Sequence, residues 1–190
     1  MARGRPKGSF TVTYESMAKD LLGELGVADA MARVFFSLPE AIAALAAEGY
    51  NEKQGRRSVS DSAVQTKWRN RVSQMDRLHA HATLSEAERT EEDHAVPLDA
   101  VRMFASALKA CWIASDAELI QAVAGMLKRC LIKIKLKPEE HDALNVDFKY
   151  KMPAGHEDLL TCDVLARYAE VFPDRVQALR EQLKELRPAQ

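Results

Sequence analysis

Apolar residues recur every three or four positions along most of this chain, and that spacing restricts it to a mainly helical fold. The clearest apolar stripe predicts a helix over residues 60–78 and consists of Val64, Trp68, Val72, Met75 and Leu78. The same spacing predicts further helices over residues 14–25, 28–36, 37–49, 158–168 and 174–186.

A helical hairpin is predicted after Pro97. Apolar residues stay at helical spacing from Val101 to Leu127, and the two helices are expected to turn near Ala114. Ser115 and Glu118 have the spacing of a capping box, in which each side chain accepts a hydrogen bond from the backbone of the other.

The apolar period changes to two beyond residue 131. Residues 132–136 alternate isoleucine or leucine with lysine, and residues 146–152 alternate apolar or aromatic residues with aspartate or lysine. Such alternation is typical of half-buried strands, so a two-stranded β-ribbon joined by residues 138–145 is expected, with a continued helix as the alternative. The lysines Lys133, Lys135, Lys137, Lys149 and Lys151 would either contact phosphates or protect the ribbon from aggregation. Two strands alone are marginally stable, so they would favour pairing across a dimer.

The predicted fold is therefore mainly α, or α+β if the ribbon forms. We divide the chain into a disordered basic tail (1–12), a tri-helical module (13–82), an acidic linker (83–96) and a C-terminal helical and β-ribbon domain (97–190). The linker boundary rests on Thr83 and Glu86, which have capping-box spacing before an acidic run ending at Pro97.

Charge is unevenly distributed, although the formal net charge of the chain is only −1. Residues 53–77 contain seven Lys and Arg against two Asp, whereas residues 86–93 contain five acids against Arg89. This asymmetry predicts that the basic segment binds a polyanion.

The predicted helix over residues 60–78 has a polar face opposite its apolar stripe. Arg pairs with guanine, Asn with adenine, and Ser or Thr with bases or phosphates. The candidate base-reading residues are Ser62, Thr66, Arg69 and Asn70, with Ser73 and Arg77 on the same face. The candidate phosphate contacts are Lys53, Arg56, Arg57, Lys67 and Arg71. The alternative is a solvated face of a helical bundle.

Residues 42–49 (IAALAAEG) and 58–64 (SVSDSAV) carry a resemblance to the helix-turn-helix of winged or tri-helical type. It covers about residues 28–80, where the short Val-Ser precedes the recognition helix. The resemblance implies that this helix enters the major groove of DNA. The connection over residues 49–60 is longer than the compact turn of that family, and no wing hairpin follows.

The N-terminal residues 3–8 (RGRPKG) form a slim basic segment. The segment is similar to the core of an AT-hook, whose arginines enter a narrow A·T minor groove. The resemblance implies that Arg3, Arg5 and Lys7 contact DNA. The same opening resembles the start of many phage and plasmid DNA-binding proteins, including small terminase subunits. The alternative is a basic tail without a specific role.

Catalytic and metal sites are not indicated by any motif. The five histidines and the acidic run have no ligand spacing, and no phosphate-binding loop, nucleophile elbow or HExxH occurs, so we expect no enzyme activity, cofactor or metal. Cys111, Cys130 and Cys162 form no CxxC pair, which fits a reducing cytoplasm. Neither a signal peptide nor an apolar run long enough for a membrane span is found.

Together these features predict a cytoplasmic protein that binds double-stranded DNA with sequence preference. A bacterial, plasmid or phage transcriptional regulator acting as a homodimer fits best, because one helix reads few base pairs. The C-terminal half would then serve oligomerisation or a protein partner. One alternative is a DNA-packaging subunit similar to a small terminase, which would form a ring. The other is a protein–protein adaptor or inhibitor without DNA binding.

Overall fold

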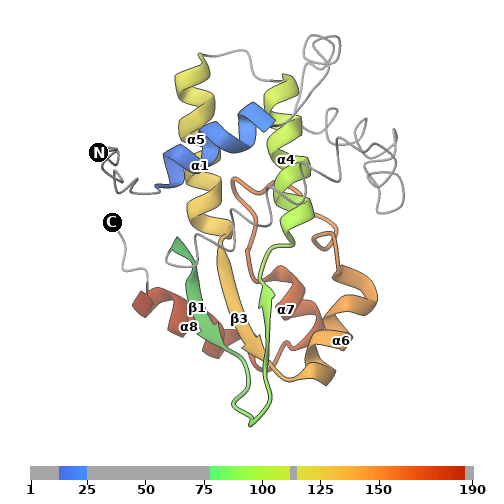
Figure 1. Cartoon of the computed structure of the whole chain (residues 1–190). Helices are drawn as coiled ribbons and strands as arrows, with labels where there is room; N and C mark the ends of the chain where they lie inside the picture. The colour runs from blue at the N-terminus through green and yellow to red at the C-terminus, as the bar shows by residue number, and fades with distance from the viewer. Residues whose placement is uncertain (1–12, 25–77, 112–114, 187–190) are drawn as a thin grey trace, which may run out of the picture.

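The computed structural model describes residues 13–24, 78–111 and 115–186 of this chain. This part is mostly helical with one small sheet, in agreement with a mainly α or α+β fold (Figure 1). Its elements are α1 (Tyr14–Glu24), β1 (Ala80–Thr83), β2 (Glu91–His94), α4 (Leu98–Cys111), α5 (Asp116–Cys130), β3 (Ile132–Leu136), α6 (Pro138–Phe148), α7 (Ala166–Val171) and α8 (Val176–Leu186).

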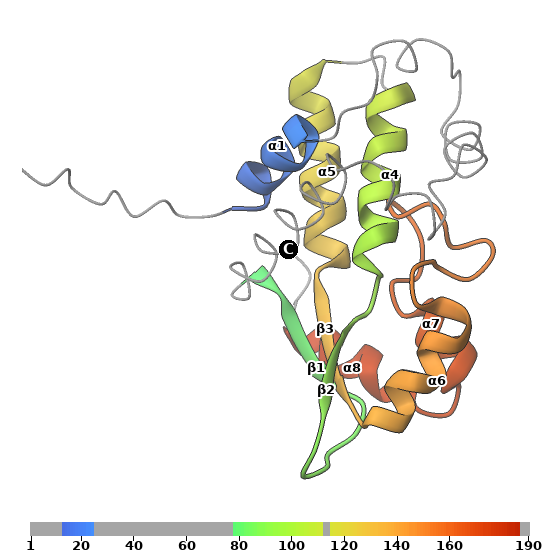
Figure 2. The same cartoon turned by 45° about the vertical axis from the view of Figure 1, so that its right-hand side comes forward.

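Helices α1, α4 and α5 form one end of the described part, where α1 crosses the α4–α5 hairpin (Figures 1 and 2). The apolar stripe of α1 enters the core through Met17, Ala18, Leu21 and Leu22, all of which are buried. We predicted α1 as the first helix of the module 13–82, and it packs on the C-terminal helices. This end of the protein therefore combines segments that are far apart in sequence.

The sheet and helices α6, α7 and α8 form the other end (Figure 2). Strand β3 lies in the middle, pairing in parallel with β1 and antiparallel with β2. The side chains of Ile132, Ile134 and Leu136 point to one face, where they form a core with residues of α6, α7 and α8. The lysines between them point to the opposite face, as the period of two requires.

Several predicted elements are confirmed. Helix α1 begins where expected, the hairpin after Pro97 is present as α4 and α5, and β3 occupies the first alternating stretch. The capping box of α5 is formed, since Ser115 Oγ accepts from the Glu118 N–H and Glu118 Oε2 accepts from the Ser115 N–H. Helix α8 follows Pro173 as predicted.

The second strand of the predicted ribbon is wrong. Residues 138–148 form α6, and the stretch 146–152 contains only the end of this helix and a turn region. Pro138 takes the first helical turn, where its missing N–H costs nothing. Glu140 also accepts a hydrogen bond from the Lys137 N–H at 2.8 Å. These local signals for a helix outweigh the alternation of apolar residues. As a result Val146, which was expected to be half-buried in a strand, lies on α6 and is 78% exposed.

The acidic segment 83–96 is also not a simple linker. It contains the end of β1 and all of β2, and Thr83 lies in a strand instead of capping a helix. Acidic residues are unfavourable in strands on their own, yet Glu92 pairs with Lys133 at 3.2 Å and Asp93 pairs with Arg167 at 3.1 Å. Tertiary ion pairs thus add to the backbone pairing with β3 that holds this segment as a strand.

The helix predicted over residues 158–168 begins later, with α7 at Ala166. Asp158 Oδ1 accepts the Leu160 N–H at 2.9 Å, and Asp163 Oδ1 accepts the Leu165 N–H at 3.0 Å. Such turns, in which an Asp side chain bonds the backbone two residues on, compete with helix formation. They therefore replace the first two turns of the predicted helix.

The remaining predicted helices, over residues 28–36, 37–49 and 60–78, lie outside the described residues except for Leu78, and the tail lies outside them as well. Among the helices that the structure describes, none has both the length and the apolar composition to cross a membrane.

The packing of α1 predicts a large effect of truncating its core side chains. Leu21 is 1% exposed, so Leu21→Ala should lower the free energy of unfolding by about 2–5 kcal/mol in urea denaturation. Lys19→Ala on the exposed face serves as the control and should cost less than about 0.5 kcal/mol, since it breaks only a surface pair with Glu15. Equal stabilities of the two variants would show that α1 is not part of this core.

Candidate functional site

The residues predicted to contact DNA all lie outside the described residues, so their mutual arrangement stays a prediction. They are Arg3, Arg5, Lys7, Lys53, Arg56, Arg57, Ser62, Thr66, Lys67, Arg69, Asn70, Arg71, Ser73 and Arg77. The structure does describe the residues that adjoin both basic segments, Thr13 after the tail and Leu78 after Arg77.

Tyr14, which follows Thr13, contacts Leu78 through its side chain at the start of α1. The Tyr14 hydroxyl donates a hydrogen bond to the Leu78 carbonyl oxygen at 2.5 Å. Both side chains pack against the core formed by α1, α4 and α5. Residues that are 64 positions apart in sequence are therefore joined by one hydrogen bond and a shared apolar contact.

Helix α1 is fixed at both ends. Thr13 and Ser16 bond each other's backbone and side chains at its start, with Thr13 Oγ1 accepting the Ser16 N–H at 3.1 Å. At the other end, Lys109 Nζ on α4 donates to the Leu22 carbonyl at 2.7 Å, which places a positive charge near the carboxyl end of the helix dipole. The anchor at Tyr14 is thus carried by a firmly held helix.

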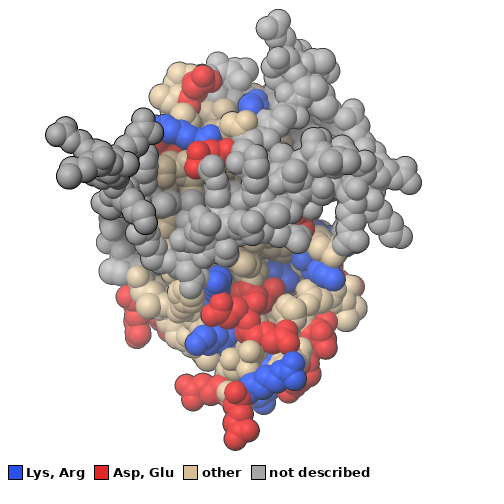
Figure 3. Space-filling model, viewed as in Figure 1, with Lys and Arg blue, Asp and Glu red and all other residues tan. Residues whose placement is uncertain are grey.

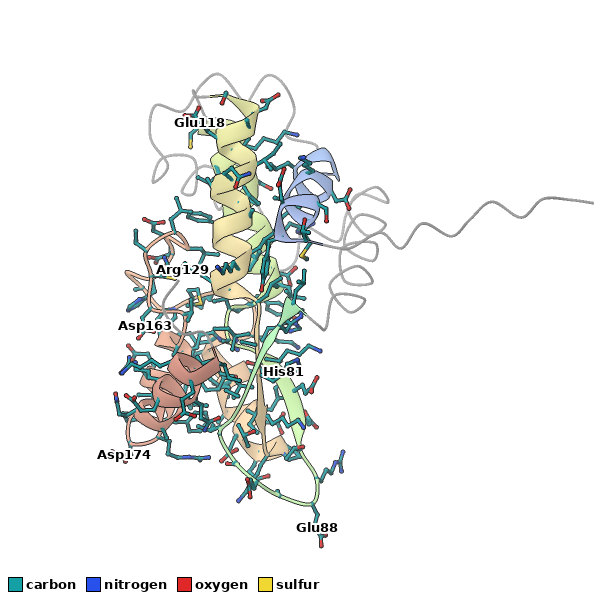
Figure 4. All side chains as sticks on the ribbon, turned by 90° about the vertical axis from the view of Figure 1, so that its left-hand side faces the viewer. His81, Glu88, Glu118, Arg129, Asp163 and Asp174 are labelled. Carbon is teal, nitrogen blue, oxygen red and sulfur yellow. The ribbon has the colours of Figure 1, made fainter. Side chains whose placement is uncertain are left out.

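The described part of the chain is acidic. It contains 22 Asp and Glu against 15 Lys and Arg, which is a formal net charge of −7. Figure 3 shows Asp and Glu side chains around the lower end of the molecule, mixed with Lys and Arg. Glu88 lies at the tip of the β1–β2 connection and points away from the body (Figure 4). This part as a whole is electrostatically unsuited to bind a polyanion.

The lysines of the predicted ribbon do not form one surface. Lys133 and Lys135 share the face of β3 away from the core, but Lys149 and Lys151 lie beyond α6, not on a paired strand. Lys133 also pairs with Glu92, and its side chain is only 14% exposed. The pairing reduces the positive charge that this face offers to a phosphate.

A buried polar cluster joins β2 to α7, and sequence reasoning missed it. Asp93 Oδ2 accepts hydrogen bonds from Arg167 Nη1 at 3.1 Å and from the Tyr168 hydroxyl at 2.7 Å. Arg167 Nη1 also donates to the His94 carbonyl at 2.8 Å, and its side chain is 1% exposed. Burial, together with the charge of Asp93 and its hydrogen bond, raises the pKa of Tyr168 well above its usual value. Tyr168 therefore stays protonated and acts as a hydrogen-bond donor.

His141 of α6 extends this cluster along β2. Its Nδ1 lies 2.9 Å from Glu91 Oε2, and its Nε2 lies 3.9 Å from Asp93 Oδ1. Glu91 and Asp93 point to the same face of the sheet because they are two residues apart on a strand. The acids on this face of β2 are thus matched by side chains of α6 and α7.

A second polar cluster closes the segment after β1. Arg175 donates to Glu140 Oε1 at 2.6 Å and to the Leu84 carbonyl at 2.8 Å, and Ser85 Oγ donates to Glu140 Oε1 at 2.7 Å. Burial opposes ionisation of Glu140, but hydrogen bonds from Ser85, Arg175 and the Lys137 N–H outweigh it and hold the pKa of this carboxyl below its usual value. Glu140 is therefore the ionised centre of a contact between three segments.

Two histidines meet beside β2. The rings of His79 and His94 pack edge to face with their centroids 5.4 Å apart. Burial of His94, and next the neighbouring His79, lowers the pKa of His94 from 6.5 to about 4. The neutral imidazole of His94 is thus the form that the folded protein accommodates.

The polar clusters around Asp93 and Glu140 hold separate segments of the chain together, and we call each of them a clasp. Asp93 Oδ2 accepts two hydrogen bonds and the Glu140 carboxylate accepts three, so each carboxylate joins separate segments of the chain. Within residues 13–24, 78–111 and 115–186, no group of three or more His, Cys, Asp or Glu residues could hold a metal ion. No sequence signal could have indicated Arg167 or Tyr168, since their partners are 73 to 75 positions away.

Comparison with known proteins finds no family model, no curated protein and no solved structure that matches this chain.

Removing the charge of Asp93 is predicted to be costly, because it leaves the buried Arg167 guanidinium without a counter-ion. Asp93→Asn should lower the free energy of unfolding by about 3–5 kcal/mol in urea denaturation. Tyr168→Phe removes one hydrogen bond and keeps the ion pair, so it should cost about 1 kcal/mol. A cost for Asp93→Asn below that of Tyr168→Phe would contradict the clasp.

His94 predicts a loss of stability in mild acid. The unfolded chain binds a proton at His94 below about pH 6.5, whereas the folded protein resists protonation down to about pH 4. The contribution of His94 to the free energy of unfolding is therefore fully present above pH 6.5 and is lost as the pH falls from 6.5 to about 4. This contribution totals up to about 3 kcal/mol. His94→Phe should flatten the pH dependence of the free energy of unfolding across this window. Parallel curves for the variant and the wild-type protein would refute the prediction.

Proposed function

We propose that this protein binds double-stranded DNA with sequence preference, as a transcriptional regulator of bacterial, plasmid or phage type acting as a homodimer. Arg69, Asn70, Thr66 and Ser62 would read bases. The residues that would hold phosphates are Lys53, Arg56, Arg57, Lys67 and Arg71. Arg3 and Arg5 would reach an adjacent minor groove.

The observation that carries this proposal is the hydrogen bond from Tyr14 to Leu78. It links Tyr14, the second residue after the basic tail, to Leu78, the last residue of the predicted recognition helix. Two weak DNA-binding segments that start from one place act on the same stretch of DNA, and their joint affinity exceeds that of either alone. A tail and a helix held at distant points of the surface would lack this advantage.

The negative charge of the described part also supports DNA binding by the two basic segments. A body with a formal charge of −7 repels phosphates, so attraction to DNA has to come from the basic residues outside it. The acidic body would then serve as a scaffold and as the site of oligomerisation or partner binding.

The proposal predicts binding to duplex DNA with a steep negative salt dependence. In fluorescence anisotropy over a salt series, Arg69→Ala combined with Asn70→Ala should weaken binding about tenfold or more, because each base contact contributes about 1–3 kcal/mol. Lys184→Ala is the matched control, since it removes one positive charge from a side chain that is 69% exposed on the acidic body, and should leave the affinity unchanged.

Tyr14→Phe tests the anchor in the same assay. This variant keeps the aromatic ring and all charges but loses the bond to Leu78, so affinity should fall a few-fold while the salt slope stays the same. Wild-type affinity in this variant would show that the hydrogen bond between Tyr14 and Leu78 does not contribute to DNA binding. Absence of binding by the wild-type protein at low salt would overturn the whole proposal and favour a protein–protein adaptor.

A further inference from the structure

The three-stranded sheet has two outer strands in the part of the chain that the structure describes. These are β1 and β2, on either side of β3. The outward peptide groups of an outer strand form a template on which another chain can add a strand. How these groups are occupied therefore decides whether the sheet can serve in assembly.

The register of β1 identifies its outward groups. The Ala80 N–H donates to the carbonyl of Leu131, just before β3, and the Leu84 N–H donates to the carbonyl of Lys135 in β3. Parallel pairing makes every second residue face the partner strand. Thr83 lies between two residues that face β3, so its own N–H and carbonyl point away from β3. A neighbouring strand would bond to both of these groups.

Gln182 of α8 occupies both groups. The Thr83 N–H donates to Gln182 Oε1 at 2.8 Å, and Gln182 Nε2 donates to the Thr83 carbonyl at 3.0 Å. One side-chain amide thus makes the pair of hydrogen bonds that a residue of an added strand would make. The two residues are 99 positions apart, so the match depends on how α8 packs.

Helix α8 holds Gln182 in place. Val176 and Leu179 are buried in the core beneath the sheet, and Leu183, next to Gln182, packs against it. Arg180 adds an ion pair with Asp163 at 2.5 Å. The amide is therefore presented by a packed helix, not by a freely moving side chain.

One outward group of the opposite edge is bonded in a similar way. Ala95 donates its N–H to the Ile132 carbonyl, so in the antiparallel ladder the backbone of His94 faces outward. Its carbonyl accepts from the buried guanidinium of Arg167 at 2.8 Å. Each outer strand thus has a peptide group bonded by a side chain from the helical layer.

We propose that Gln182 guards the β1 edge and prevents a second copy of this chain from adding a strand there. The expected pairing of strands across a dimer is then blocked, and any self-association uses other surfaces. This inference does not depend on DNA binding, so either proposal can fail without the other.

Hydrogen exchange on the wild-type protein gives the first test. The Thr83 amide, bonded to Gln182, should exchange about tenfold or more slowly than the amide of Glu88 in the exposed β1–β2 connection, after correction for intrinsic rates. Equal corrected rates would show that the edge is open and would overturn the proposal. This measurement needs no variant.

Light scattering after size exclusion, over a concentration series, gives the second test. Gln182→Ala should form larger species as concentration rises, with a stronger intermolecular β-sheet signal in infrared spectra. Gln182→Glu keeps an acceptor for the Thr83 N–H but loses the donor to the Thr83 carbonyl, and its charge discourages strand addition, so it should retain the wild-type mass. Gln177→Ala, on the same helix, removes only a side-chain contact with Glu181 and should also retain that mass.

Two outcomes of the second test overturn the proposal. Gln182→Ala could keep the wild-type mass while its circular dichroism shows that it is folded. Alternatively, the Ala and Glu variants could associate to the same extent, which would attribute association to weakened packing of α8 and not to the free edge. If Gln182→Ala fails to fold, the exchange measurement decides.

Discussion

The described structure depends on the burial of strand β3. Ile132, Ile134 and Leu136 are at most 2% exposed, and each contributes roughly 1.5–3 kcal/mol on burial. The strand follows α5 after a single residue, Leu131, so the direction in which α5 ends also sets the direction of the sheet. Both outer strands bond to β3, and helices α6, α7 and α8 cover the face on which its apolar side chains lie. Loss of this burial would separate all of these elements.

Strand β2 shows why part of this fold could not be predicted from the sequence. Glu92, Asp93 and Glu91 read as a solvated acidic run, because their partners Lys133, Arg167 and His141 are distant in the chain. The capping box of α5 and the alternation in β3 were predictable, because their signals lie within a few residues. The prediction failed at residues 146–152 for a different reason, a competing local signal. The same alternation occurs there, but Pro138 and Glu140, several residues earlier, had already started a helix.

The candidate sites also differ in whether their signals are local in sequence. The basic segments could be found by composition and helical spacing, and their contacts with DNA stay a prediction that the described residues do not test. The clasp at Asp93 and the contact between Gln182 and Thr83 had no sequence signal, since each joins residues more than 70 positions apart. A glutamine on the polar side of a helix is ordinarily solvated, and only the packing of α8 on β1 brings this amide to a backbone edge.

The anchor at Tyr14 and the acidity of the body together restrict how DNA would approach in the proposed complex. In that proposal attraction would come from the two basic segments next to Tyr14 and Leu78, whereas the described part, with its formal charge of −7, would repel phosphates. Repulsion from the acidic tip near Glu88, at the end opposite the α4–α5 hairpin, disfavours approach from that side (Figure 4). Long-range charge would thus set the orientation of the protein on DNA before any base is contacted. This orienting effect would weaken with added salt, because salt screens both the attraction and the repulsion. Affinity and orientation should therefore respond to salt together.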